Sequence, residues 1–158
     1  MNEQRRRSIA VLGLAAGIAF LGEPAFAQAV GKPQSQETNV DGVTAEIVEA
    51  VRKEGVLTLK VRYRNTGSSA AKVRFRSMRD ADAYYVTAGS TKYLILKDSK
   101  GAPLGVSTSW GAFEADIKPN GSYLFWAKYP APPAAVKKVN FFNPHTPPFE
   151  DVALTEAQ

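Results

Sequence analysis

Residues 57–76 read LTLKVRYRNTGSSAAKVRFR, and apolar side chains alternate with polar ones along both halves of this stretch. Alternation with a period of two is typical of a β-strand that buries one face and exposes the other. The Asn, Gly and Ser residues between the two halves favour turns. The stretch therefore predicts two strands joined by a turn, with inward-facing side chains at Leu57, Leu59, Val61, Tyr63, Val73 and Phe75.

The outward positions of the two strands carry cations in two triplets, Lys60/Arg62/Arg64 and Lys72/Arg74/Arg76. In a plain hairpin these triplets would face each other, and like charges opposite one another destabilise a sheet unless a partner or nearby acids neutralise them. The connection at residues 65–70 is long enough to cross to a second sheet instead. We favour this second arrangement, in which each triplet covers a separate outer face beside Glu46 or other acids.

Further segments with the same period follow at short intervals, separated by Gly, Pro, Asn and Ser. In residues 122–129, Leu124 and Trp126 fall on one side of the strand, and Tyr123, Phe125 and Tyr129 on the other. Residues 102–117 are looser, residues 28–41 read as a flexible leader, and no segment after residue 27 has a helical period. The chain is therefore predicted to be all-β, an immunoglobulin-like antiparallel β-sandwich of about 7–8 strands at residues 42–158.

Residues 1–27 have the three parts of a secretory signal peptide in order. Residues 5–7 are arginines, residues 9–22 are apolar, and residues 25–27 form a small-residue cleavage site. The apolar run is too short and too rich in Gly and Ala for a membrane span. We expect export by the Sec route, with the twin-arginine route as the alternative, and a periplasmic or secreted location.

Cleavage after residue 27 would leave 131 of the 158 residues, without a cysteine and without a transmembrane span. A domain of that size can bury a core without disulfides. Removal of three arginines and two glutamates would change the net charge from +5 to +4. A modestly basic exported domain favours anionic partners, and we do not expect nucleic acid among them.

Four segments together resemble a known family: GVLTLKVRYRNTG at 55–67, KYLILKDSKGAPL at 92–104, IKPNGSYLFWAKYPAPP at 117–133 and PPFEDV at 147–152. In order and spacing they are similar to a poorly characterised immunoglobulin-like domain family of exported bacterial proteins, which also resembles modules upstream of OmpA-like domains. The resemblance covers residues 43–154 and implies a fold and an envelope location. It transfers no catalytic residue. The chain has no OmpA-like module, so wall anchoring does not transfer either.

Few residues suggest chemistry. His145 is the one histidine, and no serine in a nucleophile-elbow context accompanies it, so we expect a surface histidine in a proline-rich loop. Asp80 and Asp82 lack the longer ligand series of a calcium loop and predict a solvated turn. The strongest candidate for a catalytic site is the carboxylate pair Glu114 and Asp116, beside Trp110 and Phe113, which would suit cleavage of a wall polymer. We expect no catalytic site, no cofactor and no metal.

The favoured interpretation is an exported, non-catalytic interaction module of the cell envelope that binds an envelope protein or an anionic envelope component. Its candidate binding residues are Lys60, Arg62, Arg64, Lys72, Arg74, Arg76, Trp110 and Phe113. Replacing Arg62 and Arg74 together by Glu is expected to weaken an anionic partner without unfolding the chain. The first alternative is a structural or stress-related envelope protein that packs against another protein, and the second is the wall-polymer enzyme. The sequence leaves the strand order and the oligomeric state open.

Overall fold

The computed structural model describes residues 34–105 and 111–157. Within them the chain forms strands and one short 3-10 helix, η1 (Met78–Ala83), and the all-β prediction is confirmed. The strands are β1 (Ser35–Glu37), β2 (Val43–Lys53), β3 (Val56–Asn65), β4 (Ala71–Phe75), β5 (Tyr85–Ala88), β6 (Thr91–Leu94), β7 (Phe113–Ile117), β8 (Ser122–Pro130), β9 (Lys138–Phe142), β10 (Phe149–Ala153) and β11 (Thr155–Glu156).

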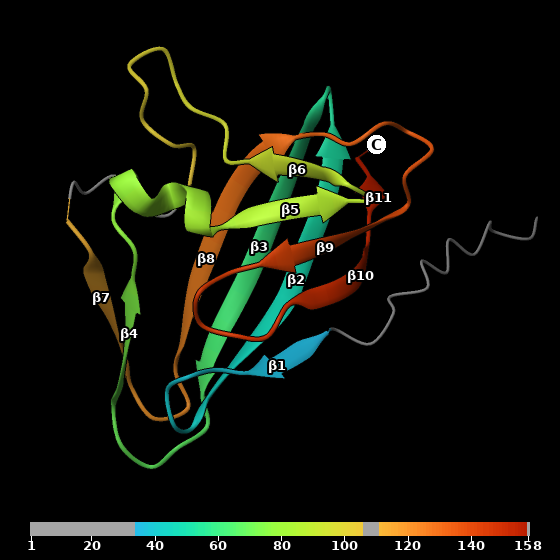
Figure 1. The fold of residues 1–158 in the computed structure, drawn as a ribbon. Coiled ribbons are helices and arrows are strands. Elements are labelled where there is room, and N and C mark those ends of the chain that lie inside the picture. Colours follow the sequence, from blue (N-terminus) through green and yellow to red (C-terminus); the bar gives the residue numbers. More distant parts are fainter. Residues whose placement is uncertain (1–33, 106–110, 158) are drawn as a thin grey trace, which may run out of the picture.

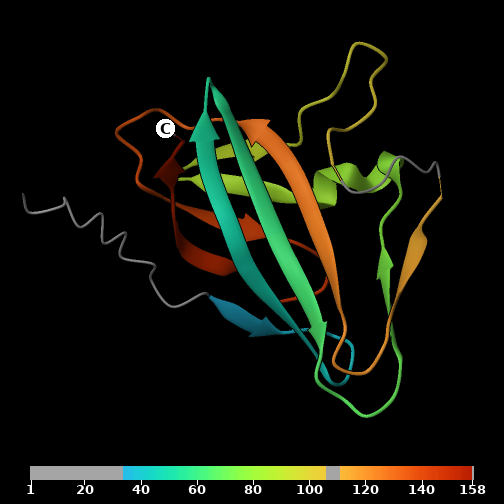
Figure 2. The ribbon, with the colours of Figure 1, turned by 180° about the vertical axis from the view of Figure 1, so that it is seen from behind.

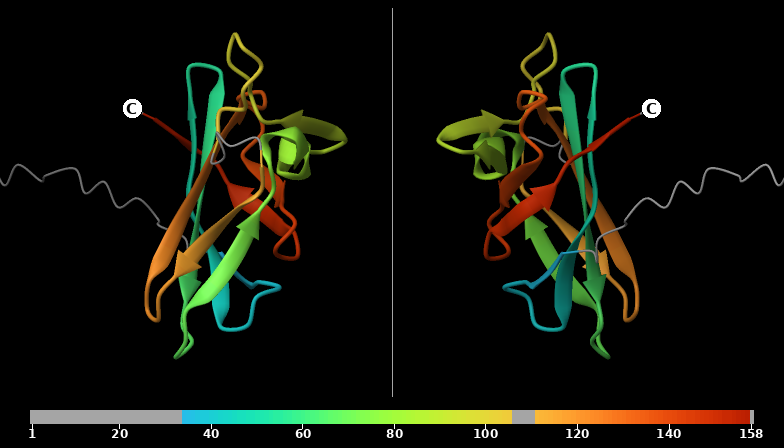
Figure 3. Two further views of the ribbon diagram at one scale, coloured as in Figure 1. Left: turned by 90° about the vertical axis from the view of Figure 1, so that its left-hand side faces the viewer. Right: turned by 90° about the vertical axis from the view of Figure 1, so that its right-hand side faces the viewer.

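The strands form a sandwich-like arrangement of two layers (Figures 1 and 3). The first layer is a sheet with the order β1-β2-β3-β8, to which β11 adds beside β2. The second layer has two separate parts, a sheet with the order β10-β9-β5-β6 and a two-stranded ribbon of β4 and β7. All of these pairings are antiparallel except that of β11 with β2.

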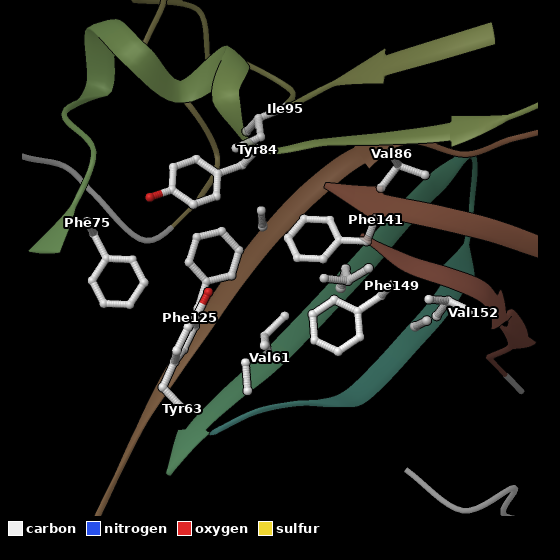
Figure 4. Close-up of a cluster of buried hydrophobic side chains, with 14 of the residues drawn as sticks. Val61, Tyr63, Phe75, Tyr84, Val86, Ile95, Phe125, Phe141, Phe149 and Val152 are labelled. Carbon is white, nitrogen blue, oxygen red and sulfur yellow. The ribbon is translucent and has the colours of Figure 1, made fainter. Parts of the chain in front are cut away.

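The core lies between the layers and contains the side chains that the alternation predicted to face inward. Leu57, Leu59, Val61 and Tyr63 of β3 are fully buried, as are Val73 and Phe75 of β4. From the second layer, Tyr84, Val86, Phe141 and Phe149 reach the same interior (Figure 4). Burial of this large apolar surface is the main contribution to the stability of a chain that has no disulfide.

The hairpin between β2 and β3 turns at residues 53–55. Glu54 has a φ of 49° and Gly55 a φ of 78°, so both central residues adopt the left-handed conformation that a tight hairpin turn requires. The register shifts between Ile47 and Glu49, which marks a bulge in β2. The long β2–β3 ladder continues on both sides of this bulge and provides a broad outer surface.

The connection from β3 to β4 crosses from the first layer to the second. Asn65, the last residue of β3, is buried, and its side-chain amide donates to the carbonyl oxygens of Ser69 and Ile117, each at 2.8 Å. Its Oδ1 accepts the backbone N–H of Gly67 at 2.9 Å. The prediction that the two basic strands lie in different sheets is confirmed, because β3 pairs with β2 and β8 while β4 pairs with β7.

Two short strands depart from the sequence prediction. The residues 28–41 were expected to be a leader without structure, and this expectation is wrong for β1, which pairs antiparallel with residues 44–46 of β2. β7 lies in the region expected to be looser. β1 is specified by its neighbour rather than by its own composition, since it has no apolar residue and depends on the free edge of β2. β7 does alternate apolar and acidic residues, within a segment otherwise rich in Gly and Ser.

Arg52 of β2 is a buried cation that fixes the carboxyl-terminal end of the chain. Its guanidinium donates to the carbonyl oxygens of Pro133 at 3.1 Å and Val136 at 2.6 Å, and it lies 3.4 Å from a carboxylate oxygen of Glu156 in β11. A buried charge requires such compensation to be tolerated. Arg52 thus joins the edge of the first layer to the loop before β9 and to β11.

Candidate functional site

The outer surface of the first layer carries three of the predicted binding residues. Because side chains alternate along a strand, Lys60, Arg62 and Arg64 of β3 point away from the core, and the register places Trp126, Leu124 and Ser122 of β8 directly beside them. Lys128 of β8 continues this row opposite Thr58. We call this surface the β3–β8 face, and it consists of Thr58, Lys60, Arg62, Arg64, Ser122, Leu124, Trp126 and Lys128. Figure 2 views the molecule from this side and shows β2, β3 and β8 next to one another.

Acids of β2 pair with two of these cations, as the sequence suggested for Glu46. The Lys60 Nζ lies 2.6 Å from Glu49 Oε2, and Arg62 Nη1 lies 3.4 Å from Glu46 Oε2. Both ion pairs are partly exposed, and pairs of that kind contribute little to stability because water screens them. Their effect on the surface is larger, since they neutralise the side of the β3–β8 face that borders β2.

The cations at the two ends of the β3–β8 face differ from those that border β2. Arg64 and Lys128 are exposed, and in the described part of the chain neither is within ion-pair distance of a carboxylate. Between them along β8 lie Leu124, 46% exposed, and Trp126, 38% exposed. The face therefore presents two large apolar side chains with a cation near each end that pairs with no carboxylate of the described residues. The sequence pattern had placed Leu124 and Trp126 on the side of the strand opposite Phe125, and this is confirmed.

The second cationic triplet lies in the other layer. Lys72 and Arg74 lie in β4, and Arg76 directly follows it. The register places Asp116 and Glu114 of β7 opposite Lys72 and Arg74. The Lys72 Nζ is 3.7 Å from Asp116 and 3.8 Å from Glu114. Since the apolar residues of β4 face the core, its cations point away from it and cannot join those of β3. Among the described residues the six cations thus form two faces, not one.

The remaining predicted site residues do not join either face. Phe113 is half-buried and stacks on Phe75, with ring centroids 5.1 Å apart and an interplanar angle of 15°, so it is a core residue. Trp110 lies outside the described residues. Glu114 and Asp116 are both exposed and share Lys72 as an ion-pair partner.

His145 is buried, with 6% of its surface exposed, and the expectation of a surface histidine is wrong. Its Nε2 lies 3.2 Å from the hydroxyl oxygen of Tyr84, which also accepts the backbone N–H of Arg76 at 3.0 Å. The rings of Tyr63 and Phe75 pack edge-on against it. The prolines around His145 predicted a stiff, exposed loop. The burial of His145 depends on Tyr84, which lies 61 residues away in the sequence, so no local pattern indicates the contact.

The environment of His145 shifts its protonation. Burial, with a smaller effect of the Arg76 charge, lowers the pKa of His145 from 6.5 to about 4. Burial also raises the pKa of its partner Tyr84 to about 12, against the lowering effect of the Arg76 backbone hydrogen bond. Both side chains are therefore neutral at neutral pH. The group acts as a polar link within the core.

The pKa of His145 predicts a pH dependence of folding. Since the folded state holds this pKa below its unfolded value, protonation favours the unfolded chain, and stability falls as the pH falls from about 6.5 towards 4. Above this window His145 is neutral in both states and contributes no slope. Between about pH 7.5 and about pH 5 we expect wild type to lose about 2 kcal/mol more than the variant His145→Gln in urea unfolding. Equal losses in the two proteins would contradict the assigned environment.

Asp80 and Asp82 lie in η1, where Asp80 Oδ2 accepts the Ser77 hydroxyl at 2.9 Å. The segment is a helical turn stabilised by this hydrogen bond. Over residues 34–105 and 111–157, no group of three His, Asp or Glu side chains is placed to hold a metal ion. No helix in the same residues has the length and apolar character to span a membrane.

Comparison with protein-family models, with curated proteins and with solved structures finds no match to this chain. The candidate site therefore depends on its geometry alone. Sequence reasoning identified the cations of β3 but did not include Leu124, Trp126 and Lys128 among the binding residues. The available signal was the alternation of β8, which exposes a tryptophan on a strand whose other side is core.

Proposed function

We propose that this chain is an exported, non-catalytic interaction module of the bacterial cell envelope, and that its β3–β8 face binds an anionic envelope component. The observation that carries the proposal is the exposed pair Leu124 and Trp126 between Arg64 and Lys128, two cations that pair with no carboxylate of residues 34–105 and 111–157. Interfaces commonly combine an aromatic anchor with surrounding charge. Unlike-charge attraction favours an anionic partner and accelerates its association.

The envelope location is supported by the signal-peptide pattern at residues 1–27, which lie outside the described residues, and by the resemblance of residues 43–154 to exported immunoglobulin-like domains. The non-catalytic role is supported by the state of the candidate acids and base. Glu114 and Asp116 are both exposed and pair with Lys72, and His145 is buried within the core.

A second candidate is packing against another protein through the opposite layer. On the outer side of the β10-β9-β5-β6 sheet, Tyr85 stacks on Phe142 with ring centroids 4.6 Å apart, and the register places the 39% exposed Leu94 beside Tyr85. Lys92 Nζ lies 3.7 Å above the Tyr85 ring. The Tyr85 ring is thus already in contact with Phe142 and Lys92, and the neighbouring Leu94 extends an apolar stripe that favours a protein partner over a stacked flat ligand.

The test of the first proposal is retention of residues 28–158, which contain every described strand, on isolated envelope material at low salt. The double variant Arg64→Glu with Lys128→Glu is expected to bind about tenfold more weakly or worse, since each exchange replaces attraction by repulsion. These residues are a sharper choice than Arg62 and Arg74, because Arg62 pairs with Glu46 and Arg74 lies in the other layer.

The matched control is Lys100→Glu with Lys137→Glu, which makes the same change of net charge at exposed positions outside the β3–β8 face. Its retention is expected to stay within about twofold of wild type, because net charge alone is a weak determinant at short range. Equal loss in both double variants would show that overall charge, not this face, governs binding. Unchanged retention in the Arg64/Lys128 variant would overturn the proposed site.

A further inference from the structure

We infer that the anionic component is a phospholipid surface, and that the β3–β8 face seats the chain on it with Leu124 and Trp126 in the lipid interface. This inference rests on the proposed function and names the class of ligand for the same site. It is carried by the placement of the two exposed apolar side chains, by the distribution of unpaired charge around them, and by the chemistry of the remainder of the face.

Leu124 and Trp126 project from the same side of β8, two residues apart, and the register places them beside Arg62 and Lys60. Trp combines a large apolar ring with one polar N–H, and for this reason it concentrates at the boundary between lipid chains and water. An exposed Leu next to it adds apolar area that gains free energy on entering the same boundary. On a broad sheet surface both can enter together.

The charges on the face are placed to meet lipid phosphates. Arg64 and Lys128 lie towards the two ends of the row on either side of Leu124 and Trp126, and no carboxylate in the described residues pairs with them. The acids that border the face, Glu46 and Glu49, are already neutralised by Arg62 and Lys60. Long cationic side chains can keep their charged ends among phosphates while their stems lie along apolar groups.

A lipid surface fits these features better than a protein surface does. A stable protein interface buries roughly 800 Å² on each partner and has an apolar, well-packed centre. Here two large apolar side chains stand among charged and hydroxyl groups, with Ser122 and Thr58 completing the rows. A bilayer supplies an anionic, laterally mobile surface without shape complementarity, so a small apolar anchor with adjacent cations is sufficient for reversible binding.

The test uses residues 28–158 with Trp110→Phe, so that Trp126 is the single tryptophan and its emission reports on its own environment. Vesicles of phosphatidylcholine with phosphatidylglycerol are expected to shift this emission to the blue and to carry the protein in flotation, whereas pure phosphatidylcholine should do neither. When Arg64→Glu and Lys128→Glu are introduced into this Trp110→Phe protein, vesicle binding is expected to weaken about tenfold or more. The control pair Lys100→Glu and Lys137→Glu is expected to weaken it by less than about twofold.

The outcomes separate this inference from the proposed function. If anionic vesicles leave the Trp126 emission unchanged while envelope material still retains the protein through Arg64 and Lys128, the face binds a protein or polymer and the lipid inference is wrong. If neither vesicles nor envelope material bind, both proposals fail. A blue shift that is equally strong in the Arg64/Lys128 variant would also overturn the inference, because it would show insertion without the charges.

Discussion

Phe75→Ala is expected to lower the free energy of unfolding by about 4 kcal/mol. Phe75 is fully buried and lies where the β4–β7 ribbon meets the first layer. Its ring contacts those of Phe113, Tyr63 and Tyr123 at centroid distances of 5.0 to 5.1 Å. Removing it leaves a cavity bounded by rigid rings that cannot close the space, so the transfer and cavity costs add.

Such a loss is a large share of the roughly 5–15 kcal/mol that is typical of a whole domain. The measurement is urea unfolding followed by circular dichroism, with Leu124→Ala as the control. Leu124 is also a large apolar residue but is 46% exposed, and its removal should cost less than about 1 kcal/mol. Similar midpoints for the two variants would contradict the placement of the core.

Asn65→Ala is expected to cost about 3 kcal/mol although it removes only a few atoms. Three backbone groups depend on this amide: the carbonyl oxygens of Ser69 and Ile117 and the N–H of Gly67. Asn65 is 1% exposed, so water cannot replace its hydrogen bonds without opening the crossing. A buried polar group without a partner costs about 1–3 kcal/mol, and relaxation of the loop recovers part of the total.

The neighbouring Thr66 provides the control for Asn65. Its hydroxyl donates to the Gly42 carbonyl at 3.1 Å, but the residue is exposed, and Thr66→Ala should cost less than about 1 kcal/mol. The two variants are compared by their urea midpoints at an unchanged slope. If Asn65→Ala is no worse than Thr66→Ala, then the crossing from the first layer to the β4–β7 ribbon does not depend on this side chain.

The elements that could be predicted from the sequence are strands in which apolar and polar residues alternate within the strand itself. β3 and β8 alternate without interruption, so their buried and exposed sides follow from the sequence, including the exposed Trp126. At the turn, Gly55 follows from local conformational preference, because glycine adopts a positive φ without strain, whereas the positive φ of Glu54 does not follow from its residue type. The crossing after Asn65 could also be inferred, since opposite triplets of cations would repel each other in one hairpin.

The features that were missed depend on contacts between distant residues. β1 is polar and becomes a strand only because the edge of β2 is available to it. His145 is buried by Tyr84 and Phe75, which are far from it in sequence. Likewise Lys128 joins Arg64 in one face only through the β3–β8 register, which periodicity within a single strand cannot specify. The candidate site was thus half predicted: its cations on β3 were found, and its apolar centre on β8 was not assigned to binding.

The most direct test of the proposed site is the salt dependence of retention on envelope material, measured for residues 28–158 from low to high ionic strength. Binding through Arg64 and Lys128 at the β3–β8 face should be strong at about 0.02 M salt and fall steeply by about 0.5 M, because the Debye length shrinks below the distance between surface charges. Retention that persists unchanged across this range would contradict an electrostatic site and assign binding to an apolar protein interface.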